Sequence, residues 1–183
     1  MKIKLAPMEG VIDFAMREIL TGLGGYDHAV TEFIRINDHL LPNKTLYKYA
    51  PELLHDGKTK SGTPVYIQLL GQHPNLMAEN ARRACDLGAP GIDLNFGCPA
   101  KTVNNHKGGS ILLREPDTVN KIVTAVRAAV PNKTPVSVKM RLGYDDKSLA
   151  IENAKAIEEA GATFLAIHAR TKQEAYRPPA HWH

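Results

Sequence analysis

The chain has 183 residues, of which 43% are hydrophobic and 23% charged, and its formal net charge is +4. A domain of this length buries roughly 70% of the surface that its unfolded chain exposes, so it needs no disulfide or metal to fold. The two cysteines do not form a disulfide framework, and no apolar stretch has the length of a signal sequence or a membrane span. We therefore expect a cytoplasmic protein without a membrane anchor, and the positive charge favours an anionic partner.

Short apolar runs alternate with helical patterns, which is typical of βα units around a parallel sheet. Helices are predicted at about 74–88 and 116–130, each beginning at a proline, and at about 148–161. The segment 37–62 is predicted as a loop with room for one short helix. Strands are predicted near residues 3–6, 29–33, 65–69, 91–95, 136–140 and 164–168.

Six such strands suggest an α/β fold of the (β/α)8 TIM-barrel class, truncated after about six strands, because a complete barrel takes about 250 residues. On length alone, a complete open doubly wound sheet is the better alternative. The polar residues of the strands favour the barrel.

Four of these strands carry polar residues, although parallel strands covered by helices should be apolar. Alternate residues of a strand point to opposite faces, so in each strand the polar side chains share one face. That face would point into a barrel, whose C-terminal mouth holds the chemistry in barrel enzymes. One such residue alone is more often structural, but five on consecutive strands favour a site. These five are Gln68, Asn95, Lys139, Arg141 and His168.

The chemistry of these side chains suits an electron-rich ring that becomes anionic when it is reduced. Lys139 is expected to place positive charge near the N1–C2=O side of a flavin, and Gln68 to bind its pyrimidine edge. Eight scattered histidines form no H-E-x-x-H motif, and neither a paired C-x-x-C nor an acidic calcium loop is present, so no metal site is predicted.

Cys98 follows the fourth strand directly, between Gly97 and Pro99. Glycine permits a tight backbone and proline stiffens it, so the thiol is expected on an ordered loop over the barrel mouth. By contrast, Cys85 lies within a helical pattern and is predicted to be inert.

Four roles are open to Cys98. As a metal ligand it has only His106 as a nearby companion, and as a redox pair with Cys85 it is poorly placed. As a nucleophile it needs a histidine base such as His168 and an oxyanion site, and no acyl-transfer motif is present. A proton donor remains, because a thiol that titrates near neutral pH suits acid–base work. The segment 107–110 lacks the phosphate-loop spacing and is interpreted as a glycine turn.

Four segments of the chain resemble the tRNA-dihydrouridine synthases, over residues 3 to about 176. They are Ala6-Pro7-Met8-Glu9-Gly10-Val11, Asp93-Leu94-Asn95-Phe96-Gly97-Cys98-Pro99, Val138-Lys139-Met140-Arg141-Leu142-Gly143 and His168-Ala169-Arg170-Thr171. Thr31-Glu32-Phe33-Ile34-Arg35 and Tyr176 resemble the bacterial C-type branch, which acts on uridine 16.

The resemblance implies an FMN enzyme in which NADPH reduces the flavin. FMNH2 would pass a hydride to C6 of a uridine in tRNA, and Cys98 would give the proton to C5, which forms 5,6-dihydrouridine. The target base must be flipped out to be reached. By the same resemblance, Asn95 would hold that base. The implied flavin contacts are Pro7, Met8, Glu9, Gln68, Lys139 and His168, and the implied tRNA contacts are Arg35, Asn95, Arg141 and Tyr176.

In such an enzyme the barrel is followed by a helical RNA-binding domain, so residues 1–183 would form an incomplete FMN-binding barrel without strands seven and eight. Those strands commonly hold phosphate, so we expect this chain alone to bind FMN weakly or not at all and not to turn over. No obligate protein partner is expected, although open sheet edges invite self-association. Two alternatives remain. Activity on free uracil would indicate a flavin barrel that reduces free pyrimidines, and salt-dependent tRNA affinity without activity would indicate a non-catalytic tRNA-binding fragment.

Overall fold

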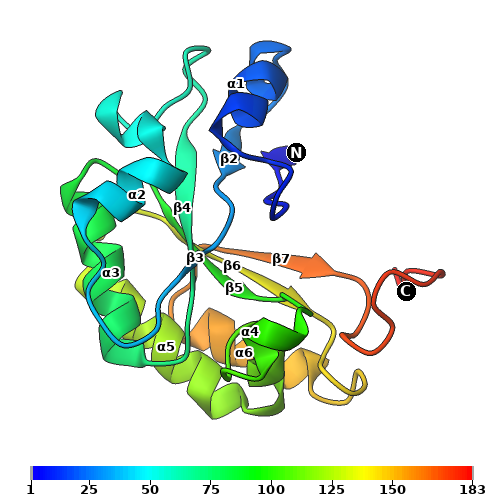
Figure 1. The fold of residues 1–183 in the computed structure, drawn as a ribbon. Coiled ribbons are helices and arrows are strands. Elements are labelled where there is room, and N and C mark those ends of the chain that lie inside the picture. The colour runs from blue at the N-terminus through cyan, green and yellow to red at the C-terminus, as the bar shows by residue number, and fades with distance from the viewer. Residues whose placement is uncertain (1, 183) are drawn as a thin grey trace.

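The computed structural model describes residues 2–182 and contains one curled parallel sheet that forms part of a barrel (Figure 1). Its strands follow one another in the order β1-β2-β4-β5-β6-β7, and the short β3 also pairs with β4. The strands are β1 (Lys4–Leu5), β2 (His28–Val30), β3 (Ile34–Arg35), β4 (Val65–Leu70), β5 (Ile92–Phe96), β6 (Val136–Arg141) and β7 (Phe164–His168).

Helices connect these strands, as the crossover of a parallel sheet requires. They are α1 (Phe14–Gly22), α2 (Asn43–Tyr49), α3 (Pro74–Asp86), α4 (Lys101–Asn104), α5 (Pro116–Ala129) and α6 (Ala150–Glu159), with 3-10 helices η1 (Pro51–Leu54) and η2 (Gly109–Arg114). The predicted α/β half-barrel is therefore confirmed, and so are the three long helices.

The strand predicted at 29–33 is present only at its start, because β2 ends at Val30 and a separate strand, β3, begins at Ile34. Val30 pairs with Tyr66 and Ile34 pairs with Leu69, so the chain between β2 and β3 is one residue longer than the facing part of β4. This is the geometry of a bulge. At the bulge, the Thr31 hydroxyl takes the place of a backbone carbonyl and accepts a hydrogen bond from the Gln68 N–H at 3.0 Å.

The helix α1 was missed because its polarity is inverted. Its fully buried side chains are Arg17 and Thr21, whereas Phe14 and Ile19 are exposed. Arg17 Nε lies 2.8 Å from the Glu52 carboxylate of η1, which neutralises the buried charge. An apolar-face pattern cannot reveal a helix that buries an ion pair.

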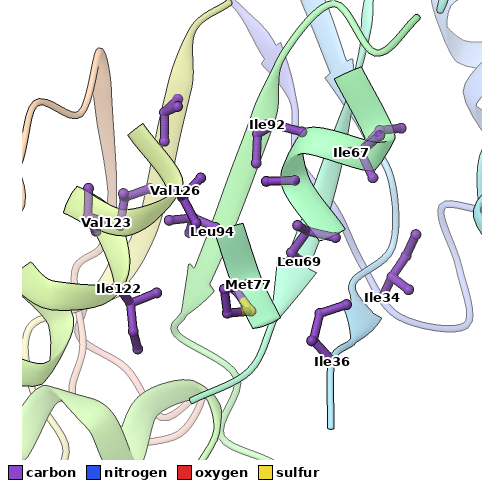
Figure 2. Packing of buried hydrophobic residues seen from close by; sticks show 14 of the residues in the cluster. Ile34, Ile36, Ile67, Leu69, Met77, Ile92, Leu94, Ile122, Val123 and Val126 are labelled. Atoms are coloured by element: carbon purple, nitrogen blue, oxygen red, sulfur yellow. The ribbon is translucent and has the colours of Figure 1, made fainter. Parts of the chain in front are cut away.

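The aliphatic faces of β4 and β5 pack against α3 and α5, as predicted from the alternation (Figure 2). Each side chain removed from water in this way stabilises the fold by roughly 1.5–3 kcal/mol. The residues seen there include Ile67, Leu69, Ile92 and Leu94 of the strands and Met77, Ile122, Val123 and Val126 of the helices.

The inner face of the sheet divides into an aromatic part and a polar part. Near the N-terminal ends of the strands, the rings of His28 and Tyr66 stack with centroids 4.5 Å apart, and Phe164 lies 6.4 Å from His28. Gly91 makes room for this group, because a Cβ there would lie 2.7 Å from the Tyr66 ring. The polar side chains of the same face therefore gather towards the C-terminal ends.

The last βα unit of the sheet is less covered than the others. Ile151 of α6 is 69% exposed, and Ile167 and, in part, Phe164 of the edge strand β7 are also exposed. Self-association through such edges stays a prediction. Within residues 2–182, no helix combines the length and apolar character needed to cross a membrane.

Candidate active site

A cavity of about 390 Å³ lies at the C-terminal ends of the strands, and we call it the inner cavity. Residues from the loop after β1, from the segment between β2 and β3, from β4 to β7 and from the loops after β5 and β7 line it. Ten of the eleven site residues predicted from the sequence take part: Pro7, Met8, Glu9, Gln68, Asn95, Cys98, Lys139, Arg141, His168 and Tyr176.

The parallel register explains why these side chains meet. Asn95 of β5 lies beside Lys139 of β6, and two residues further along Arg141 lies beside His168 of β7. Neighbours in register point to the same face of a sheet. The convergence predicted from the alternation is therefore present.

Asp93 is the centre of the polar network beneath this cavity, and it is fully buried. Its carboxylate accepts hydrogen bonds from Lys4 Nζ at 2.8 Å, from Gln68 Nε2 at 2.6 Å and from the Ser137 hydroxyl. Asp93 was not predicted as a site residue from the sequence. The signal was present, because alternation places it on the same face as Asn95.

The loop that carries Cys98 is ordered, as predicted, by bonds at both of its sides. Asn95 Oδ1 accepts hydrogen bonds from the N–H groups of Gly97 and Cys98, both at 2.9 Å. The Cys98 carbonyl accepts from Ser110 N at 3.1 Å, Ser110 Oγ at 2.9 Å and Asn104 Nδ2 at 3.1 Å. Residues 107–110 lead from the turn after α4 into the start of η2, and they support the loop through Ser110.

The Cys98 thiol keeps its proton at neutral pH. Burial raises the pKa of the Cys98 thiol, and the Glu9 carboxylate raises it further, whereas Arg35 and Arg141 lower it. Burial raises the pKa of Cys85 on α3 to about 11. Both cysteines are free, and Cys98 is the one that lines the cavity.

His168 is neutral and its tautomer is defined. Burial, together with the charges of Arg141 and Lys139, lowers the pKa of His168 to about 4. Arg170 Nη1 lies 3.1 Å from His168 Nε2. Because a guanidinium can only donate, Nε2 must accept and the ring proton must be on Nδ1. Burial also lowers the pKa of Lys139, and the Asp93 carboxylate opposes this shift.

A second cavity of about 530 Å³ adjoins the first, and we call it the outer cavity. Glu9, Phe33, Cys98 and Tyr176 line both cavities, so Cys98 belongs to the wall that the two cavities share. The outer cavity adds Lys172 and Gln173; like Phe33, they had not been identified from the sequence, because they lie outside the strands whose alternation pointed to the site.

Arg35 is the one predicted site residue that does not line the inner cavity. It lines a separate cavity of about 280 Å³ with Gln72, His73 and His106. Its charge still lowers the pKa values of Cys98 and Glu9. Within residues 2–182, no group of three or more His, Cys, Asp or Glu side chains could hold a metal ion.

Comparison with known proteins gives a consistent result. A family model described as dihydrouridine synthase matches residues 4–183. The tRNA-dihydrouridine(16) synthases of Shewanella oneidensis, Pseudomonas putida and Haemophilus influenzae are 60%, 56% and 55% identical to this chain. These matches cover 97–100% of the chain but only 56–58% of the relatives. The chain thus spans a little more than half the length of the curated relatives that it matches.

Proposed function

This chain belongs to the dihydrouridine synthase family, and from that premise we propose that it carries the catalytic acid and the ring-side part of the flavin site of a tRNA uridine reductase. The product would be 5,6-dihydrouridine. The relatives' names support tRNA as the substrate and uridine 16 as the position. NADPH is the proposed reductant.

The inner cavity offers groups that fit the ring of FMN. Lys139 supplies positive charge, His168 supplies a neutral ring whose proton is on Nδ1, and Gln68 supplies an amide. Pro7 and Met8 line the same cavity with apolar surface. FMN bound there would, once reduced, supply the hydride for C6 of the uracil ring.

The observation that carries the proposal is that Cys98 lines both cavities. With FMN in the inner cavity and a uracil in the outer cavity, Cys98 would lie between the two cavities and within reach of the uracil ring. Cys98 then gives its proton to C5 and becomes a thiolate. The charges of Arg35 and Arg141, which lower the thiol pKa, stabilise that thiolate.

The outer cavity suits a base that has been flipped out of an RNA. Phe33 and Tyr176 line it, and Tyr176 is 71% exposed. Aromatic side chains of this kind stack on bases at about 1–3 kcal/mol each. Lys172 adds a positive charge for the backbone. We propose Tyr176 and Arg35 as tRNA contacts, and Asn95 and Arg141 as contacts at the base.

Cofactor binding is tested by titrating the chain with FMN and recording the visible absorbance and fluorescence of the flavin. We expect weak but saturable binding that Lys139→Met weakens further. The matched control is Lys121→Met, on the exposed face of α5, which should leave the affinity unchanged. Equal affinities of the two variants would contradict the assignment of the inner cavity.

The reaction is tested with tRNA that lacks dihydrouridine, at FMN concentrations high enough to compensate for weak binding. Nucleoside mass spectrometry then measures dihydrouridine formed per chain. Cys98→Ala should lower the yield by about 100-fold or more, since general acids contribute on that order, whereas Cys85→Ala should not. Equal measurable yields from the two variants would contradict the proposal, whereas no product from the unchanged chain would agree with the expectation that it does not turn over alone. Faster reduction of free uracil would favour a reductase of free pyrimidines.

A further inference from the structure

A continuous series of hydrogen bonds runs from a buried carboxylate to the cysteine loop. Asp93 Oδ2 accepts from Gln68 Nε2 at 2.6 Å, and Gln68 Oε1 accepts from Asn95 Nδ2 at 2.9 Å. Asn95 Oδ1 then accepts the backbone N–H groups of Gly97 and Cys98. The three side chains are at most 8% exposed, so water does not compete strongly for these bonds.

Asp93 determines the direction of the series, that is, which group of each amide donates and which accepts. An ionised carboxylate only accepts hydrogen bonds, so Gln68 must turn its NH2 group towards Asp93 and its carbonyl towards Asn95. Asn95 must in turn donate to Gln68, which leaves its Oδ1 for the backbone of the loop. Lys4 Nζ donates to Asp93 Oδ1 at 2.8 Å and Gln68 Nε2 donates to Oδ2 at 2.6 Å, so both oxygens of the carboxylate act as acceptors.

We propose that Asp93 is a positioning residue that holds the Cys98 loop in place through the ordered amides of Gln68 and Asn95. The buried Asp93 carboxylate thereby orients the Gln68 amide in the wall of the inner cavity. Through Asn95, it also holds the loop that carries the thiol. The role in catalysis rests on the proposed function, because it matters only if Cys98 is the proton donor. The order of the hydrogen bonds does not depend on that function.

A simpler role for Asp93 is to neutralise Lys4 in the barrel interior. The two roles differ in their effect on the hydrogen bonds of Gln68 and Asn95 when Asp93 is substituted. In Asp93→Asn, the new amide can accept or donate, so the series loses its fixed direction. In Ser137→Ala, one bond to Asp93 is lost but the direction remains. Ser137→Ala is therefore the matched control for general weakening of this region.

A double-mutant cycle separates the two roles. Asn95→Asp alone places a carboxylate at each end of Gln68, which has only one NH2 group to share between them. In the Asp93→Asn background, the same substitution lets the series run in reverse, because Gln68 can donate to position 95 and accept from position 93. The substitution should therefore be harmful in one background and beneficial in the other, which is a direct sign of coupling.

The measurement is the hydrogen-exchange rate of the Gly97 and Cys98 amides, followed by NMR on the whole chain. Asp93→Asn should speed this exchange about tenfold, the loss expected for one hydrogen bond to a well-ordered acceptor, while Ser137→Ala should change it less than threefold. Adding Asn95→Asp to Asp93→Asn should slow it again, whereas Asn95→Asp alone should speed it. The pH midpoint of Cys98 alkylation should likewise shift in Asp93→Asn and in Asn95→Asp alone, and shift back when the two substitutions are combined.

The proposal is overturned if Asn95→Asp has the same effect in both backgrounds, or if Asp93→Asn behaves like Ser137→Ala. Unfolding curves of all variants verify that each is folded. If one does not fold, Gln68→Met, which removes both of the amide's bonds, replaces it and should speed exchange at Gly97 and Cys98. No flavin, NADPH or tRNA is needed, so this result stands apart from the outcome for the proposed reaction.

Discussion

Arg141 Nε donates a hydrogen bond to the carbonyl oxygen of Gly97, 2.9 Å away in the loop that carries Cys98. From the same guanidinium, Nη1 donates to the carbonyls of Thr171 at 3.1 Å and Ala175 at 2.9 Å. The side chain is 2% exposed. A single buried charge therefore joins the loops after β5 and β7.

Arg141→Met should lower the free energy of unfolding by about 2–4 kcal/mol, because buried carbonyls lose a charged donor. The residues after β7 should also become more sensitive to proteases. Urea unfolding and limited proteolysis measure the two effects. Arg177→Met is the control, since this exposed arginine also bonds to backbone carbonyls but only within its own segment. Equal losses in the two variants would show that burial at Arg141 contributes nothing.

Gly109 allows the close approach of η2 to the cysteine loop. Its φ is +67°, and a Cβ there would lie 2.8 Å from the Cys98 carbonyl oxygen. Gly109→Ala should cost about 1 kcal/mol for the left-handed backbone and about 1–3 kcal/mol more for the collision. Gly62→Ala, at φ +87° with open space around it, should show only the first cost. Unfolding free energies measure both, and equal losses would argue against the tight contact at Cys98.

The pKa of the Cys98 thiol should respond in opposite directions to the loss of Glu9 and the loss of Arg35. Only the thiolate reacts with an alkylating reagent, so the pH midpoint of the reaction reports the pKa. In the unchanged chain this midpoint should lie above the ordinary thiol value of 9.0, since burial and Glu9 raise the pKa of Cys98. Glu9→Gln should lower the midpoint and Arg35→Gln should raise it. Shifts of the same sign in both variants would mean that the loop has moved.

The contrast between the central strands and the N-terminal half shows what the sequence could predict. In β5 and β6, alternation of apolar and polar residues is regular, and parallel register turns that alternation directly into a cavity lined by Asn95 and Lys139. The bulge at Thr31 left no such pattern, because a side-chain oxygen takes over a backbone bond. The helix α1 also shows no apolar pattern that would predict it, because it buries the charged side chain of Arg17.

The partners of the site residues were harder to predict than the residues themselves. Alternation shows which face Asp93 occupies, but it does not show which of several polar neighbours it binds. Asn104 and Ser110 hold the Cys98 carbonyl from short helical turns, and turns of this length carry no periodic signal. Such contacts depend on the three-dimensional arrangement of loops.

His168 should make the stability of the fold depend on pH in the acidic range. Its pKa in the folded chain is about 4, below the ordinary histidine value of 6.5. Between these two values the unfolded chain binds a proton that the folded chain does not, so the free energy of unfolding rises with pH there. The stabilisation is fully present above 6.5 and is lost as the pH falls towards 4. His168→Asn, which cannot titrate, should flatten this part of the profile.

Thermal melts of the unchanged chain and of His168→Asn, recorded between pH 7 and pH 4, measure the difference. Other groups titrate in the same range, among them Glu9, whose pKa is raised by burial, but they are common to both proteins. His55→Asn, which changes an exposed histidine, measures the effect of losing a histidine as such. If His168→Asn loses as much stability on acidification as the unchanged chain, then burial and the charges of Arg141 and Lys139 do not keep His168 neutral. The assignment of the ring proton to Nδ1 must then be abandoned.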